Sequence, residues 1–81
     1  MSAGQLTRLI RTVAAVSGQS ADRITAGTSL TELGLDSLDR VVLAARVEQD
    51  FAALLPDDVL AGVFRVGDLA DVLAVKAESQ A

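Results

Sequence analysis

Residues 36–51 read DSLDRVVLAARVEQDF, and this stretch decides most of the fold that we expect. The sequence predicts a helix from Ser37 to Phe51, with Asp36 as its N-cap because a carboxylate can accept the exposed N–H groups of a first turn. At about 100° per residue, the apolar side chains of this helix fall on two nearly opposite faces. One face carries Leu43, Val47 and Phe51 with Ala44 nearby, and the other carries Leu38, Val41, Val42 and Ala45.

A second apolar face on this helix needs an explanation, because one stripe is enough to pack a helix against a core. A chain of 81 residues is too short to surround a helix completely. We therefore expect the Leu43 face to lie in the core. The Leu38 face is expected to be partly exposed and to present apolar surface to something else.

Upstream of this helix, residues 4–16 repeat apolar side chains at helical spacing and predict a first helix. Gly18 is a suitable residue for its left-handed C-terminal end. Residues 19–36 then form a long connection rich in Ser, Thr, Gly and Asp, in which Gly34 offers a positive φ before the next helix. Four apolar residues should pin this loop onto the helices and keep it ordered: Ile24, Leu30, Leu33 and Leu35.

Downstream, Pro56 and the acidic pair that follows it introduce a short helix expected over residues 59–62. Residues 66–77 have helical spacing and predict the last helix, and residues 78–81 are expected to fray. The predicted fold is all-α, a small bundle of three main helices plus one short helix, with a long ordered loop between the first and second helices. We expect residues 1–81 to form a single domain.

The residue types that are missing exclude several classes of function. The sequence has no Cys, which excludes disulfides and thiolate zinc sites, and no His, the commonest general base and metal ligand. A net charge of −4 argues against binding to nucleic acid and suits partners with basic surfaces. No apolar run is long enough to span a membrane, and the N-terminus lacks a basic signal region. We expect a cytoplasmic, monomeric protein with no metal.

Ser37 is the candidate for a chemical function, and the residues around it allow three interpretations. A serine nucleophile needs a base, and the sequence offers neither a His nor a plausible Lys beside it. Ser37 and Asp36 are ordinary residues for capping a helix, which requires no further function. A serine at a helix N-terminus also suits covalent attachment of a phosphate or phosphodiester, which the dipole and the free N–H groups stabilise. Physical chemistry alone leaves the cap and both modifications open.

The chain contains TSLTELGLDSLD at residues 28–39, followed in order by VEQDF at 47–51, LPDD at 55–58 and VGDLADVL at 66–73. These four segments, at consistent spacing, resemble acyl carrier proteins. The first looks like the attachment region of that family. The resemblance covers nearly the whole chain. It implies the small helical fold that the apolar spacing also predicts.

The resemblance implies that this chain is a carrier and not an enzyme, with no catalytic residue of its own. A phosphopantetheinyl transferase would attach 4′-phosphopantetheine to Ser37, between Asp36 and Leu38, and the arm's thiol would carry an acyl group as a thioester. The reactive sulfur would then come with the cofactor, which accounts for a sequence without Cys. The other partners implied are acyl-loading and acyl-processing enzymes, namely an acyltransferase, a ketosynthase or a ligase.

In the family the second helix is the main docking surface, which would give the Leu38 face a use. Acidic residues there would pair with basic residues of the partners. The partner-binding residues that the resemblance implies are Asp36, Leu38, Asp39, Val41, Val42, Ala45 and Glu48.

The sequence departs from typical fatty-acid carriers on this helix. Val42 stands where a Glu is expected, Arg40 and Arg46 add positive charge, and Arg65 stands where a Ser or Thr cap is common. These departures favour a dedicated carrier in polyketide or another specialised, fatty-acid-like biosynthesis. The native-looking start and the lack of flanking linkers lead us to expect a freestanding protein. An excised synthase domain, an aminoacyl or peptidyl carrier, and an unmodified helical interaction module are the alternatives.

Overall fold

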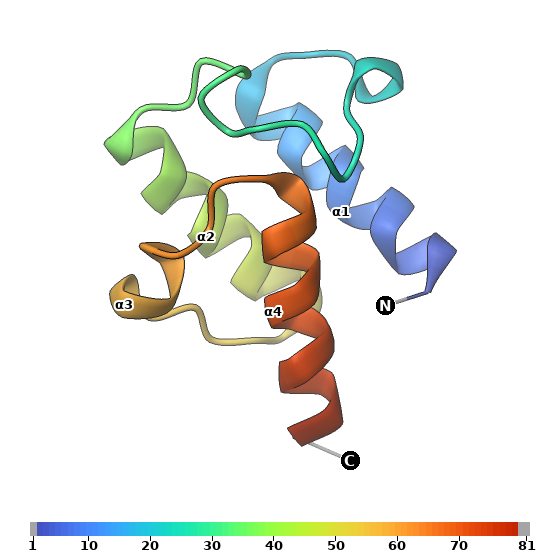
Figure 1. Ribbon diagram of the computed structural model, residues 1–81, viewed down its shortest axis with the longest axis vertical. Helices are drawn as coiled ribbons and strands as arrows, with labels where there is room; N and C mark the ends of the chain where they lie inside the picture. The colour runs from blue at the N-terminus through green and yellow to red at the C-terminus, as the bar shows by residue number, and fades with distance from the viewer. Residues whose placement is uncertain (1, 80–81) are drawn as a thin grey trace.

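The computed structural model describes residues 2–79, and the regular structure in that range is helical (Figure 1). The elements in chain order are α1 (Ala3–Ser17), the short 3₁₀ helix η1 (Ala21–Arg23), α2 (Ser37–Phe51), α3 (Asp57–Leu60) and α4 (Val66–Ser79). The three long helices form the bundle, and α3 lies in the connection between α2 and α4. The predicted all-α bundle of three main helices and one short helix is confirmed.

Local sequence signals explain where the first two long helices begin and end. α1 starts with a capping box in which the Ser2 Oγ accepts the Gln5 N–H and the Gln5 side chain accepts the Ser2 N–H. It ends at Gly18, whose φ of 73° is the predicted left-handed conformation. α2 has the predicted bounds, and it ends at Ala52 with a φ of 51°, which is unusual for a residue with a side chain.

The predicted bounds of the two later helices were wrong in part. The short helix begins at Asp57, directly after Pro56, and not at residue 59, because the fixed φ of proline and the two acidic residues suit a first turn. α4 continues through Ser79, so the fraying predicted for residues 78 and 79 was wrong. Ala and Glu are good helix formers and nothing in that stretch interrupts the helix. The rest of the predicted frayed tail, residues 80–81, lies outside the described residues.

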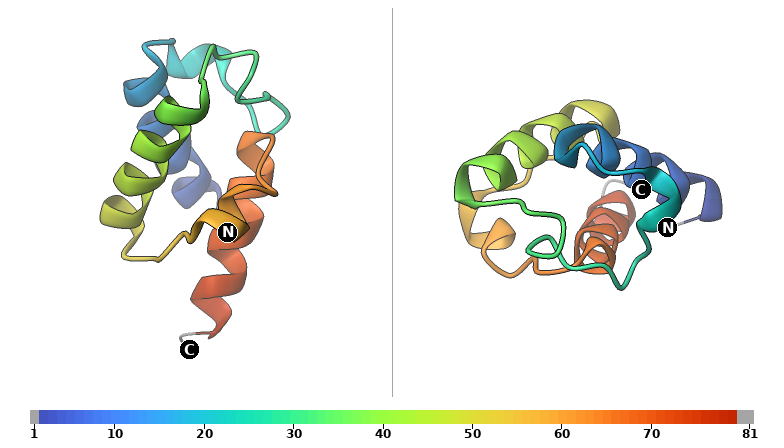
Figure 2. Two further views of the ribbon diagram at one scale, coloured as in Figure 1. Left: turned by 90° about the vertical axis from the view of Figure 1, so that its left-hand side faces the viewer. Right: turned by 90° about the horizontal axis from the view of Figure 1, so that it is seen from above.

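The loop between α1 and α2 lies across one end of the bundle, at the top in Figure 1 and in the left-hand view of Figure 2. Gly34 has a φ of 77°, as predicted. The Leu30 N–H donates to the Phe64 carbonyl at 2.9 Å, and the Val66 N–H donates to the Thr28 carbonyl at 3.0 Å. The loop is ordered as predicted, and its four apolar side chains are all buried: Ile24, Leu30, Leu33 and Leu35.

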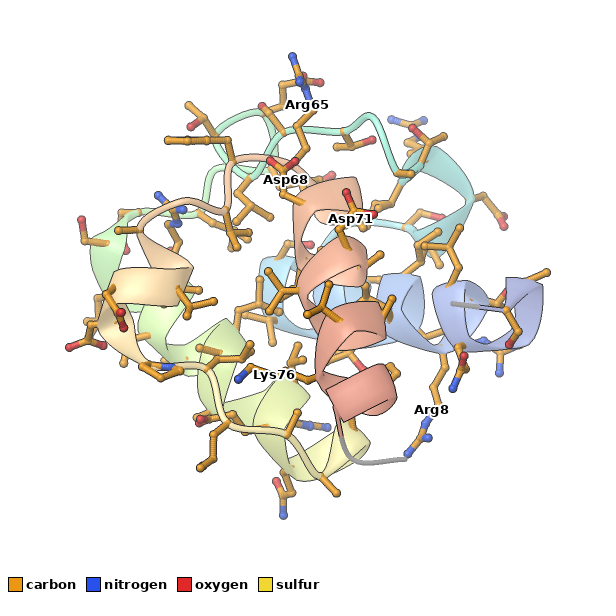
Figure 3. All side chains as sticks on the ribbon, turned by 60° about the horizontal axis from the view of Figure 1, so that its bottom comes forward. Arg8, Arg65, Asp68, Asp71 and Lys76 are labelled. Carbon is orange, nitrogen blue, oxygen red and sulfur yellow. The ribbon has the colours of Figure 1, made fainter. Side chains whose placement is uncertain are left out.

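The start of α4 is built around Asp68, beside Arg65 in Figure 3. One oxygen of its carboxylate, Oδ2, accepts the N–H groups of Arg65 and Phe64, both at 3.0 Å. These hydrogen bonds, from Arg65 first and then Phe64, lower the pKa of Asp68 because they favour its ionised form. Asp68 therefore satisfies N–H groups just before the helix, whereas a Ser or Thr at position 65 would have accepted N–H groups of the first turn. In that turn the Val66 and Gly67 N–H groups donate to the Thr28 and Ala26 carbonyls.

The face of α2 that was predicted to lie in the core is buried, except for one residue. Leu43, Ala44 and Val47 are buried as predicted. Phe51 is only partly buried, although we placed it in the core, because the helix ends there and the ring packs at the edge. The Arg8 guanidinium lies 5.0 Å from the centre of that ring, a cation–π contact, and also donates to the Asp50 carbonyl.

Candidate functional site

The second apolar face of α2 is exposed, as the two-stripe pattern predicts. Leu38 exposes 71% of its surface, Val41 54% and Val42 52%, and Ala45 is exposed as well. These four residues, the Leu38 face, form an apolar patch that the fold itself does not use. Single exposed apolar residues are common on proteins, whereas several at helical spacing on one helix indicate a surface for a partner.

Ser37 occupies the first position of α2, directly after its N-cap. Asp36 Oδ1 accepts the Asp39 N–H at 2.9 Å, and Asp39 Oδ2 accepts the Asp36 N–H at 3.3 Å. This reciprocal pair is a capping box made of two aspartates. It fixes the start of the helix while leaving the Ser37 side chain exposed to solvent.

The first turn of α2 retains hydrogen-bonding capacity for an anion. The N–H groups of Ser37 and Leu38 precede the first helical hydrogen bond, and they donate to no group within residues 2–79. The helix dipole places a partial positive charge at the same point. Both features favour a phosphate group bonded to the Ser37 oxygen, although the carboxylates of Asp36 and Asp39 offset part of that attraction.

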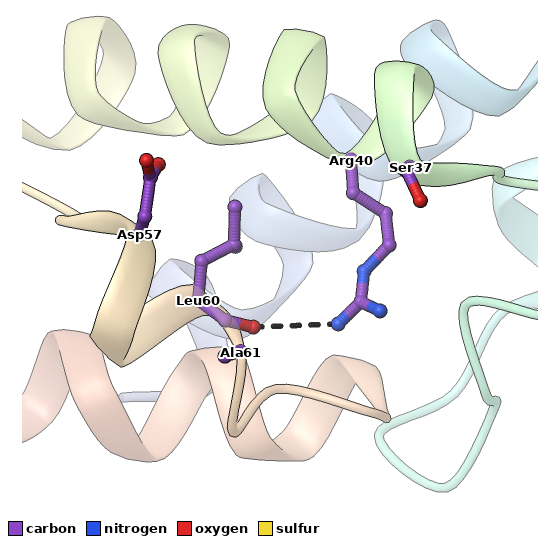
Figure 4. A pocket seen from close by; sticks show the side chains of 5 residues that line it. All are labelled: Ser37, Arg40, Asp57, Leu60 and Ala61. Atoms are coloured by element: carbon purple, nitrogen blue, oxygen red, sulfur yellow. Dashed lines mark hydrogen bonds between the residues drawn. The ribbon is translucent and has the colours of Figure 1, made fainter.

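Arg40 lies near Ser37 with an orientation that its sequence position, noted above only as an added positive charge on this helix, did not indicate. Its side chain is partly buried and reaches from α2 to the end of α3 and the segment after it, where Nη2 donates to the carbonyls of Leu60, at 3.3 Å, and Val63. Ser37, Arg40 and α3 residues line a hollow of about 170 Å³ beside the start of α2 (Figure 4). Spacing alone places Arg40 one turn from Ser37 but carries no signal for its inward orientation.

Glu48, predicted to bind partners, has a partner within the fold. Its Oε2 accepts the Leu55 N–H at 2.7 Å and so ties the α2–α3 connection to α2. The side chain is partly buried, so a partner would meet a carboxylate with one oxygen already in use.

Residues 2–79 contain neither a membrane-spanning helix nor a metal site. No helix there is long and apolar enough to cross a membrane. The same residues include no group of three or more His, Cys, Asp or Glu side chains arranged to hold a metal ion.

Comparison with known proteins identifies the class to which this fold and site belong. Residues 7–73 match the family described as "Phosphopantetheine attachment site". An acyl carrier protein of Sinorhizobium fredii is 38% identical over 52 residues, which is 63% of this chain and 67% of that protein. The chain belongs to the acyl carrier protein family, since the match covers most of its length.

Family membership decides four of the sequence-based predictions. The chain is a carrier of acyl groups and not an enzyme, and its cofactor is 4′-phosphopantetheine. Its partners include a phosphopantetheinyl transferase and acyl-processing enzymes. The structure fits that cofactor through the exposed Ser37 hydroxyl, the free N–H groups beside it and a buried Arg40 Nε that lacks a partner among the described residues.

Proposed function

We propose that Ser37 carries the phosphopantetheine and that the Leu38 face of α2 docks the partner enzymes. The observation that carries the proposal is the exposed Ser37 hydroxyl at the first position of α2, next to two N–H groups free to receive an anion. Ser37 also lies within residues 7–73, which match the attachment-site family. The capping box of Asp36 and Asp39 holds this geometry before any modification occurs.

Attachment at Ser37 needs no catalytic group from this chain. The Ser37 Oγ forms a bond to the phosphorus next to pantetheine in coenzyme A, and the bond from that phosphorus to the bridging oxygen breaks. Adenosine 3′,5′-bisphosphate leaves, and the hydroxyl proton passes to a base of the transferase. When bound, the cofactor supplies the thiol that holds the acyl group as a thioester.

The docking surface we propose combines apolar and acidic side chains. Leu38, Val41, Val42 and Ala45 supply apolar area that the fold does not bury. Asp36 and Asp39 lie beside Ser37 and each keeps one carboxylate oxygen free of the capping box, so both can attract basic partner residues. Glu48 would add charge at the far end of the face.

We infer a specialised, polyketide-like pathway from the departures on this surface. Val42 exposes an apolar side chain where a more acidic helix is usual, and Arg46 exposes a cation on the same helix. Such a surface suits a restricted set of partners. Loading assays with acyltransferases, ketosynthases and adenylating ligases test this: acyl groups should load, and loading of amino acids alone would contradict it.

Intact-mass spectrometry after incubation with coenzyme A and a broad-specificity phosphopantetheinyl transferase tests the attachment site. The wild-type protein should gain the mass of one phosphopantetheinyl group, and Ser37→Ala should gain none. Ser20→Ala is the matched control, because Ser20 is an exposed serine in the loop before α2, and it should be modified fully. An unmodified but folded wild type would refute the proposal and favour an unmodified interaction module.

The docking role has its own test, which does not depend on the pathway. Val42→Glu should leave the circular dichroism spectrum unchanged and alter the rate at which partner enzymes act on the modified protein. Unchanged rates with every partner tested would show that the Leu38 face is not the docking surface.

A further inference from the structure

Arg40 is partly buried and makes an incomplete set of hydrogen bonds. Nη2 is satisfied by the Leu60 and Val63 carbonyls, which anchor the guanidinium against the end of α3. Nε is buried, and within residues 2–79 it has no hydrogen-bond partner. A cationic N–H that is removed from water without a partner is costly, so such groups usually have one in the working state of a protein.

Arg40 also lines a hollow that begins at Ser37. The hollow of about 170 Å³ is lined by Ser37, Arg40, Asp57, Leu60 and Ala61. Figure 4 shows the Ser37 and Arg40 side chains leaving the same side of α2, with the Arg40 guanidinium reaching the Leu60 carbonyl. Ser37 and Arg40 are one helical turn apart, which is the spacing at which side chains of a helix meet.

We propose that Arg40 binds the phosphodiester on Ser37 and so positions the cofactor arm along the α2–α3 hollow. The Nε–H donates to one phosphate oxygen, which gives the buried donor its missing acceptor. An arginine suits this contact because its guanidinium is always charged and pairs well with phosphate oxygens. Arg40 is prearranged for it, since the Leu60 and Val63 carbonyls already hold the guanidinium in place.

The charges around the hollow favour one placement of the phosphate. Asp57, the other charged residue of the lining, lies at the opposite end from Ser37 in Figure 4. A phosphodiester is therefore attracted to the Arg40 end and repelled from the Asp57 end. The inference rests on the proposed attachment at Ser37 and adds a positioning residue to it.

Nuclear magnetic resonance of the ¹⁵N-labelled protein before and after complete modification tests the contact. Among the six arginine Nε–H signals, that of Arg40 should move most and exchange more slowly with solvent after modification. The ³¹P signal of the modified protein should differ between wild type and Arg40→Gln. Arg46→Gln is the matched control, because Arg46 is exposed on the same helix, and its ³¹P signal should match that of wild type.

The outcomes separate this inference from the proposed function. Failure of Ser37 to gain the arm refutes the attachment site. Complete modification with an unmoved Arg40 Nε–H signal refutes only the Arg40 contact. A moved signal with the same ³¹P shift in wild type and Arg40→Gln also refutes it, because the arm would then touch Arg40 through another group. If Arg40→Gln does not fold, the wild-type comparison of the Nε–H signals decides the question alone.

Discussion

Replacing Leu43 or Val42 with alanine perturbs the two faces of α2 at adjacent positions. Leu43 is 1% exposed and Val42 is 52% exposed. Leu43→Ala removes three carbon atoms from the core, which costs about 2.4 kcal/mol in transfer free energy at about 0.8 kcal/mol per carbon. The cavity that remains raises the total loss of unfolding free energy to about 3–4 kcal/mol. Val42→Ala removes two carbons that are half exposed already, so it should cost about 0.8 kcal/mol or less.

Urea unfolding, followed by the helical circular dichroism signal, measures both losses. A domain of 81 residues has a total stability of roughly 4–12 kcal/mol, so Leu43→Ala should remove a large share of it. Val42→Ala should shift the midpoint only slightly, with the same dependence on urea. Similar losses for the two variants, or a larger loss for Val42→Ala, would refute the assignment of core and surface faces.

Four further substitutions test particular contacts. Gly67→Ala should lower the free energy of unfolding, measured in urea, by about 1–3 kcal/mol, because the added Cβ would lie 2.9 Å from the Ala26 carbonyl oxygen. An unchanged free energy of unfolding would refute this close approach. Ala52→Gly should raise the free energy of unfolding in the same experiment by about 1 kcal/mol, because the left-handed φ of 51° is unfavourable for alanine. Phe51→Ala should lower the free energy of unfolding by about 1–2 kcal/mol, since the ring is only partly buried. Truncation of a fully buried aromatic typically costs ~3–5 kcal/mol. The ionised form of Asp68, whose pKa is lowered, stabilises the fold above about pH 4, and this contribution disappears as the pH falls through that pKa. Asp68→Asn should therefore lower Tm at pH 7 and have little effect near pH 2, and an equal effect at both would contradict the cause given for the shift.

The candidate site was predictable from sequence in some respects only. The helix start at Ser37 and its cap at Asp36 follow from short-range preferences. The physical chemistry of a helix N-terminus left three roles open for Ser37, namely a simple helix cap, attachment of a phosphate and attachment of a phosphodiester. Only the resemblance to acyl carrier proteins selected phosphopantetheine. The inward orientation of Arg40 could not be predicted, because its acceptors, the Leu60 and Val63 carbonyls, lie 20 and 23 residues away.

The sequence by itself determined the long helices, because their apolar spacing and caps act within a turn or two of the chain. The bounds of α2 and the left-handed conformations at Gly18 and Gly34 belong to this group. Tertiary structure decided which side chains lie between elements, since burial depends on segments far apart in sequence. It placed Phe51 at the edge of the core and joined Glu48 to the α2–α3 connection by a hydrogen bond. It also directed the Arg40 side chain of α2 inward, beside Ser37.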